Sequence, residues 1–218
     1  MRLPHFTESR TVLRLARPAY EHSLQDPAHT SKHILRVLRI AHQIAEGVQV
    51  DLRLLEPAVI LHDVYRPASE VPGQEVMDGT LSRAQEILEQ VGYVPDEQRQ
   101  ILQAISTHSR SSLQEQEKTS LGTVLYDADK LDGIGAHGVR RAASYGEARG
   151  WTEQQTASWY LGRVLDVVRN EPLYHDKSKH LAIRRLTYSL SWCKKRLPAD
   201  FDGHLQRHGY ADARQVRF

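Results

Sequence analysis

The chain has 218 residues, with 29 lysines and arginines against 27 aspartates and glutamates, so its formal net charge is only +2. Hydrophobic residues make up 40% and charged residues 26%, which predicts one globular domain over residues 1–218. A single cysteine, Cys193, excludes a disulfide framework and a cysteine-based zinc site. No apolar run reaches the roughly 18 residues that span a bilayer, and the first residues lack the apolar centre of a signal peptide. We therefore expect a cytoplasmic protein.

Apolar side chains recur at helical spacing along nearly the whole sequence, which predicts an all-α fold. Ser31 and Asp51 are expected to cap two helices, and Thr152 with Gln155 forms a capping box for a later one. In chain order, the predicted helices cover about residues 31–47, 51–62, 80–91, 95–108, 119–131, 152–171 and 179–196. The short connections between them are typical of a compact helical bundle.

Four polar residues fall on helix faces that the periodicity predicts to be buried. They are His33, His62, Asp63 and Asp129. A buried carboxylate is costly without a cation or a hydrogen-bond network, and a divalent metal bound by two imidazoles and two carboxylates would satisfy all four residues. Mixed nitrogen and oxygen donors without thiolate suit manganese, iron, cobalt, nickel or zinc better than calcium. By spacing alone, hydrogen-bonded core histidines and a pairing of aspartate with Lys130 remain equally open.

The order of these residues resembles the H…HD…D pattern of the HD superfamily of metal-dependent phosphohydrolases. Three blocks strengthen the resemblance, at residues 33–37 (HILRV), 58–63 (AVILHD) and 127–135 (DADKLDGIG). They are similar to consecutive blocks of small stand-alone bacterial HD hydrolases of the YpgQ/YedJ type. The resemblance covers about residues 25–195 and implies a compact HD-domain helical bundle with flanking helical segments at both ends.

The resemblance also implies the chemistry of the site. It makes His33, His62, Asp63 and Asp129 ligands of a divalent ion, which could be Mn, Mg, Ni, Co, Fe or Zn. It implies hydrolysis of a nucleotide, including release of pyrophosphate from nucleoside triphosphates, by a metal-activated water. Asp63 or Asp129 in the ligand shell, or His108 outside it, would manage the proton.

A second metal is a further possibility that the resemblance raises. Many relatives have a histidine where this sequence has Asp78, and Asp78 with His108 would be its ligands. Asp78 could instead cap a helix, and His108 could bind substrate or simply close its helix. We expect one firmly held metal. The remaining histidines, including His5 and His42, show no ligand spacing in the sequence.

A phosphate substrate needs positive charge beside the metal. Lys130 follows Asp129 directly and is the first candidate, followed by Arg66 and Arg141, although each could be a solvated ion-pair partner. Asp132 could orient a ligand or Lys130. The glycine-containing segment 133–138 lacks the GK[ST] ending of a phosphate loop and is interpreted as a helix junction.

The expected partner is a small phosphate ester or nucleotide, and a homodimer is left open. Basic residues between 177 and 196 are interpreted as a solvated helix face, so nucleic acid is not the expected partner. Two other functions stay open. One is a nucleotide- or nucleic-acid-binding regulatory module with little catalysis. The other is a di-iron HD oxygenase, which would need six protein ligands.

Overall fold

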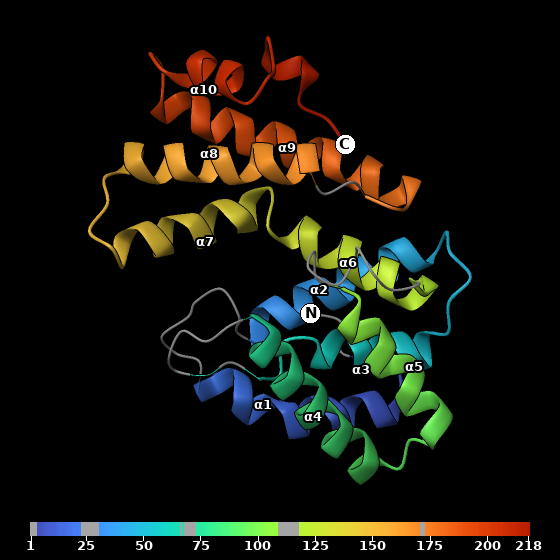
Figure 1. The fold of residues 1–218 in the computed structure, drawn as a ribbon. Coiled ribbons are helices and arrows are strands. Elements are labelled where there is room, and N and C mark those ends of the chain that lie inside the picture. Colours follow the sequence, from blue (N-terminus) through green and yellow to red (C-terminus); the bar gives the residue numbers. More distant parts are fainter. Residues whose placement is uncertain (1–3, 23–30, 66, 68–72, 109–117, 171–172) are drawn as a thin grey trace. The chain divides into compact units, whose positions relative to one another are not determined.

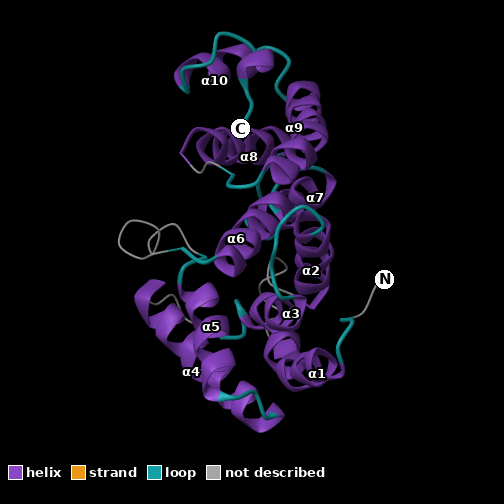
Figure 2. Ribbon diagram, turned by 90° about the vertical axis from the view of Figure 1, so that its right-hand side faces the viewer, coloured by secondary structure: helices purple, strands orange, loops and turns teal. Residues whose placement is uncertain are grey.

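The computed structural model describes residues 4–22, 31–65, 67, 73–108, 118–170 and 173–218. Every regular element among these residues is helical, with ten α-helices and one short 3₁₀ helix at Ala213–Gln215 (Figures 1 and 2). The predicted all-α fold class is therefore confirmed. The chain divides into two compact units, Met1–Ala128 and Asp129–Phe218, and each is described by itself.

The first unit is built around a short apolar helix, α3, that packs against its neighbours α1, α2 and α5. All residues from Leu54 to Leu61 are buried, so α3 lies inside the unit rather than on its surface. The helices of this unit are α1 (Thr7–His22), α2 (Ser31–Ala45), α3 (Leu52–Leu61), α4 (Gly73–Val91), α5 (Pro95–Ser106) and most of α6 (Ser120–Asp132).

Local sequence explains how α3 starts and continues. The Asp51 carboxylate accepts a hydrogen bond from the Arg53 amide at 2.8 Å, as predicted for an N-cap. Pro57 lies inside the helix and has no N–H for the Arg53 carbonyl, one turn earlier. The Tyr93 hydroxyl donates to that carbonyl at 3.5 Å. The helix thus continues past the proline to Leu61, and the next two residues, His62 and Asp63, lie directly at its end.

The second unit consists of helices packed around α8, which contacts α7, α9 and α10. Its α-helices, after the end of α6, are α7 (Ala136–Glu147), α8 (Glu153–Asn170), α9 (Asp176–Arg196) and α10 (Phe201–Arg207). The turn between α6 and α7 uses Gly135 at φ 81°, a conformation that favours glycine. Its amide donates to Ser189 Oγ at 2.8 Å, which ties the turn to α9. The predicted helix junction is therefore confirmed at residues 133–135, whereas residues 136–138 form the first turn of α7.

Helix boundaries differ from the predictions mainly at the starts. The helix predicted from residue 80 begins at Gly73, and the one predicted from 179 begins at Asp176. The Thr152–Gln155 capping box is confirmed, with reciprocal hydrogen bonds of 2.8 and 3.2 Å. In the described part of the chain, the helices are all too short or too polar to cross a membrane.

Candidate metal centre

His62 and Asp63 directly follow α3, and both are buried. The Nδ1 atom of His62 lies 2.8 Å from the carbonyl oxygen of Val59, one turn back. A carbonyl only accepts, so the neutral ring carries its proton on Nδ1 and its lone pair on Nε2. This is the arrangement by which a backbone carbonyl orients a metal-binding histidine.

His33 enters the same site from α2. It is the third residue of that helix and is buried on the face that packs against α3. Its Nε2 atom lies 3.8 Å from Oδ2 of Asp63, and Nε2 of His62 lies 3.5 Å from the same oxygen. The two imidazole rings have centroids 5.5 Å apart. Two helices therefore direct their imidazoles at one carboxylate.

His108 comes from a third direction, two residues after α5. It is buried, its Nδ1 contacts the Ile105 carbonyl, and its ring meets that of His62 edge-on at 5.2 Å. One ligand atom from each of His62, Asp63 and His108 lies within 4.8 Å of the others. The structure thus brings His108 to the predicted ligands His62 and Asp63.

The donor set fits a divalent cation. The contacts of 3.5 and 3.8 Å to Asp63 are longer than the 2.7–3.2 Å of an ordinary hydrogen bond. Two metal–ligand bonds of about 2.1 Å place their donor atoms roughly 3.0–3.4 Å apart at octahedral or tetrahedral angles. A small inward movement of His33 and His62 would reach that spacing. Imidazole nitrogens with a carboxylate and no thiolate suit manganese, iron, cobalt, nickel or zinc.

The predicted residues of the DADKLD block occupy the end of α6. Asp129 and Lys130 are half-buried there, and their roles as ligand and phosphate contact stay predictions. Asp132 is fully buried, with Oδ2 3.5 Å from Nη1 of Arg141. Arg185 belongs to the basic stretch that was predicted to be a solvated helix face, but it donates to the Leu131 carbonyl at 2.8 Å. A basic residue on a distant helix gives no local signal of such a contact.

Of two further predicted residues, one cannot be described and the other lies away from this cluster. Arg66 lies outside the described residues. Asp78 is exposed on α4, where its carboxylate accepts a hydrogen bond from Gln74 at 2.8 Å. It is the sixth residue of that helix, so the alternative interpretation of Asp78 as an N-cap was wrong. Among the described residues, no group of three metal-binding side chains includes it.

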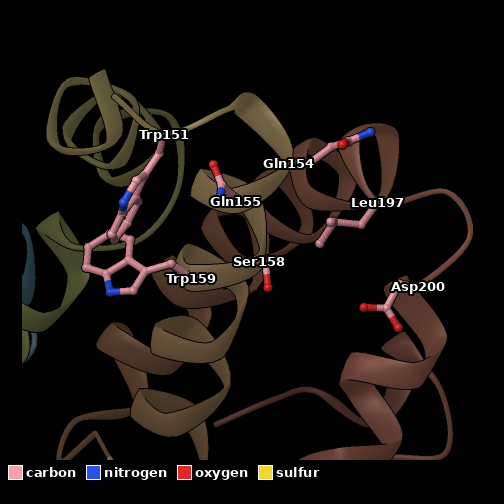
Figure 3. A pocket seen from close by; sticks show the side chains of 7 residues that line it. All are labelled: Trp151, Gln154, Gln155, Ser158, Trp159, Leu197 and Asp200. Atoms are coloured by element: carbon pink, nitrogen blue, oxygen red, sulfur yellow. The ribbon is translucent and has the colours of Figure 1, made fainter. Parts of the chain in front are cut away.

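A surface pocket in the second unit is lined by aromatic and polar side chains and not by a cluster of metal-binding residues. Figure 3 shows two tryptophan rings at one end and Asp200 at the other; the lining residues are Trp151, Gln154, Gln155, Ser158, Trp159, Leu197 and Asp200. Ser158 Oγ and Asp200 Oδ2 lie 3.0 and 3.2 Å from the same atom, Nε2 of His204. A serine hydrolase triad needs the hydroxyl and the carboxylate on opposite ring nitrogens. We therefore assign no nucleophilic serine to this pocket.

Comparisons with known proteins indicate the family that the segment containing these residues resembles. Residues 30–134 match the HD domain family. The chain is 27% identical over 192 residues to the uncharacterized protein YpgQ of Bacillus subtilis, covering 82% of this chain and 87% of YpgQ.

Two solved structures share the fold. A predicted HD superfamily hydrolase from an uncultured Thermotogales bacterium is 25% identical with a TM-score of 0.63, over 90% of this chain and 94% of that one. YpgQ from Bacillus subtilis in complex with ADP is 21% identical with a TM-score of 0.64, over 90% and 96% of the two chains. The segment that carries the buried histidines and aspartate thus matches the HD domain family, and the chain is similar to YpgQ and to a predicted HD superfamily hydrolase.

Proposed function

We propose that this protein is a metal-dependent phosphohydrolase that cleaves a phosphoester or phosphoanhydride bond of a nucleotide. The observation that carries the proposal is the buried cluster in which His33 and His62 face one oxygen of Asp63. A similar protein is described as a predicted HD superfamily hydrolase, and YpgQ was crystallised with ADP. The first supports hydrolysis as the reaction class, and the second supports a nucleotide as the ligand class.

The residues of the cluster have separable tasks in this proposal. A divalent cation supplies Lewis acidity and an activated water nucleophile when it is bound. His33, His62 and Asp63 would hold it, with Asp129 as the fourth ligand predicted from the sequence. His62 is oriented for this task by the Val59 carbonyl.

Other side chains would act on the substrate. His108 lies beside His62, where its imidazole can move a proton to or from the reacting phosphate. Lys130 and Arg141 would neutralise the charge that develops on the phosphoryl oxygens. The alternative role of His108 as a ligand of a second metal is compatible with its contacts to His62 and Asp63.

The test is an assay of the purified full chain against a panel of nucleotides with Mn²⁺, Mg²⁺, Ni²⁺ or Co²⁺, after elemental analysis of the protein. We expect metal-dependent release of phosphate or pyrophosphate. Loss of an outer partner of a metal site costs about 10–100-fold in activity, so loss of the ligand in Asp63→Ala should cost more than about 100-fold. Its circular dichroism should stay helical.

The matched control is Asp202→Ala, which removes an exposed carboxylate from α10 in the second unit. It should keep wild-type turnover. Undiminished turnover in Asp63→Ala would refute the assigned site.

Binding of ADP that is unchanged after complete metal removal, without any turnover, would instead favour the regulatory binding module. Two tightly bound irons with oxygen uptake would favour the oxygenase.

A further inference from the structure

A second group of histidines and a carboxylate lies in the first unit, formed by His5, His42 and Glu56. We call it the N-terminal cluster. Nε2 of His42 lies 3.0 Å from Oε1 of Glu56, and Nδ1 of His5 lies 3.7 Å from the same oxygen. The two imidazole rings are stacked, with centroids 4.5 Å apart and planes inclined by 16°. Three segments distant in sequence thus meet at one carboxylate oxygen.

Glu56 is the buried centre of the cluster. Its side chain is 0% exposed, whereas His42 is 13% and His5 is 46% exposed. Burial raises the pKa of the Glu56 carboxyl, but the adjacent His42 imidazole, the Ser9 hydroxyl and hydrogen bonds from the His5 and Phe6 amides together hold this pKa below its ordinary value. The carboxylate is therefore ionised at neutral pH and presents a full negative charge beneath two imidazoles.

The spacing of the donor atoms is suited to a metal ion. Two bonds of about 2.1 Å place their donors roughly 3.0–3.4 Å apart, and the two distances to Glu56 Oε1 are 3.0 and 3.7 Å. Ligand atoms of all three residues lie within 4.8 Å of one another. Nearly parallel rings cannot both point at one ion, so one ring must turn. His5 is half exposed and has the room to do so.

We propose that His5, His42 and Glu56 form a second, separate binding site for a borderline transition metal such as Zn²⁺, Ni²⁺, Co²⁺ or Cu²⁺. Two imidazoles and one carboxylate are a common donor set for these ions, and the exposed side of His5 leaves room for water as a further ligand. The site is distinct from the cluster of His33, His62, Asp63 and His108, here called the HD cluster, because it shares no residue with it.

Binding requires a rearrangement of protons but no oxidation. Nε2 of His42 already lies 3.0 Å from Glu56 Oε1, and the neutral ring must carry its proton on Nδ1 when Nε2 ligates. His5 must be neutral to ligate through Nδ1, so acidification weakens binding. The bound ion would connect the segment at His5 to α2 and α3, and would hold this segment against the first unit.

The test measures zinc binding by equilibrium dialysis of the full chain after removal of all metal. His5→Phe keeps an aromatic ring on His42 and keeps the His5 backbone amide that donates to Glu56 at 2.8 Å, but lacks Nδ1. His180→Phe, at an exposed position on α9, is the matched control. We expect the wild type and His180→Phe to bind one equivalent of Zn²⁺ more than His5→Phe.

Hydrogen exchange gives a second readout that does not depend on activity. Zinc at ten times its Kd should slow local opening of the segment around His5 and Phe6 about tenfold in the wild type, and should leave His5→Phe unchanged. Equal zinc stoichiometry in the wild type and His5→Phe, or exchange at this segment that zinc does not slow in the wild type, would overturn the proposal. His5→Phe should retain nucleotide hydrolysis, so failure of this site and failure of the HD site are distinguishable.

Discussion

The first unit contains two clusters that combine histidines with a buried carboxylate, and they differ in how the carboxylate is held. Glu56 accepts a backbone amide at 2.8 Å and contacts His42 at 3.0 Å, which are hydrogen-bond distances. The contacts from His33 and His62 to Asp63 are longer, at 3.8 and 3.5 Å. Glu56 thus accepts a hydrogen bond from a backbone amide, whereas Asp63 faces two imidazoles at distances longer than a hydrogen bond.

We expect variants of the two carboxylates to differ in whether they change the stability of the fold or the turnover of substrate. A carboxylate that accepts hydrogen bonds from the protein contributes to folding, because removing it leaves buried donors without their acceptor. A carboxylate that faces metal-binding nitrogens contributes chiefly to the chemistry of the bound ion. We therefore expect Glu56 variants to change unfolding and Asp63 variants to change turnover.

The largest expected effect on stability is that of Glu56→Ala. It removes the buried charge opposite His42 and the acceptor of the His5 amide. Breaking a buried pair by removing one partner costs about 3–5 kcal/mol, and urea denaturation should show a loss of that order. Glu56→Gln, which keeps an acceptor, should lose less. If Glu56→Ala instead lowered turnover without loss of stability, the contrast between the two clusters would be wrong.

His108→Ala should reduce metal-dependent turnover by about 10–100-fold, the usual cost of losing a side chain that supports a metal site. The reason is its edge-on contact with the His62 ring and its place beside Asp63. Steady-state kinetics with a nucleotide substrate give the measurement, and His180→Phe is again the control. Unchanged turnover would exclude His108 from the reaction and restrict the site to His33, His62, Asp63 and the predicted Asp129.

Arg141 offers a further test, because its guanidinium lies 3.5 Å from the fully buried carboxylate of Asp132. If this pair is structural, as at Glu56, Arg141→Ala should lower the free energy of unfolding by about 1–3 kcal/mol. If Arg141 binds substrate phosphate, as predicted from the sequence, the variant should raise KM. Denaturation and kinetics on the same preparation distinguish these outcomes.

The smallest expected effect is a pH dependence from Glu56. Its pKa in the folded protein lies below the ordinary 4.5, so its contribution to stability is fully present above that value and is lost as the pH falls through the folded pKa. Thermal unfolding of the wild type and Glu56→Gln should therefore converge as the pH falls below about 4.5. Curves that stay equally separated down to acid would contradict this interpretation.

Much of the fold could be predicted from the sequence because helices obey local rules. The capping carboxylate of Asp51, the Thr152–Gln155 box and the apolar periodicity act within a few residues of each other. The starts of α4 and α9 were missed because their first turns are polar and show no apolar stripe. No helix was predicted over residues 136–147, where the structure has α7, so the local rules predicted most of the helices but not all of them.

The sequence by itself determined the HD pair, since His62 and Asp63 follow an apolar helix whose buried face continues into them. The tertiary structure decided which residues from distant parts of the sequence lie next to the carboxylates of Asp63 and Glu56. It placed His108 beside His62, and it brought His5 and His42 to Glu56, from positions 51 and 14 residues away in the chain. Periodicity predicts which face of a helix is buried, but only the packing of several helices determines which side chains meet there.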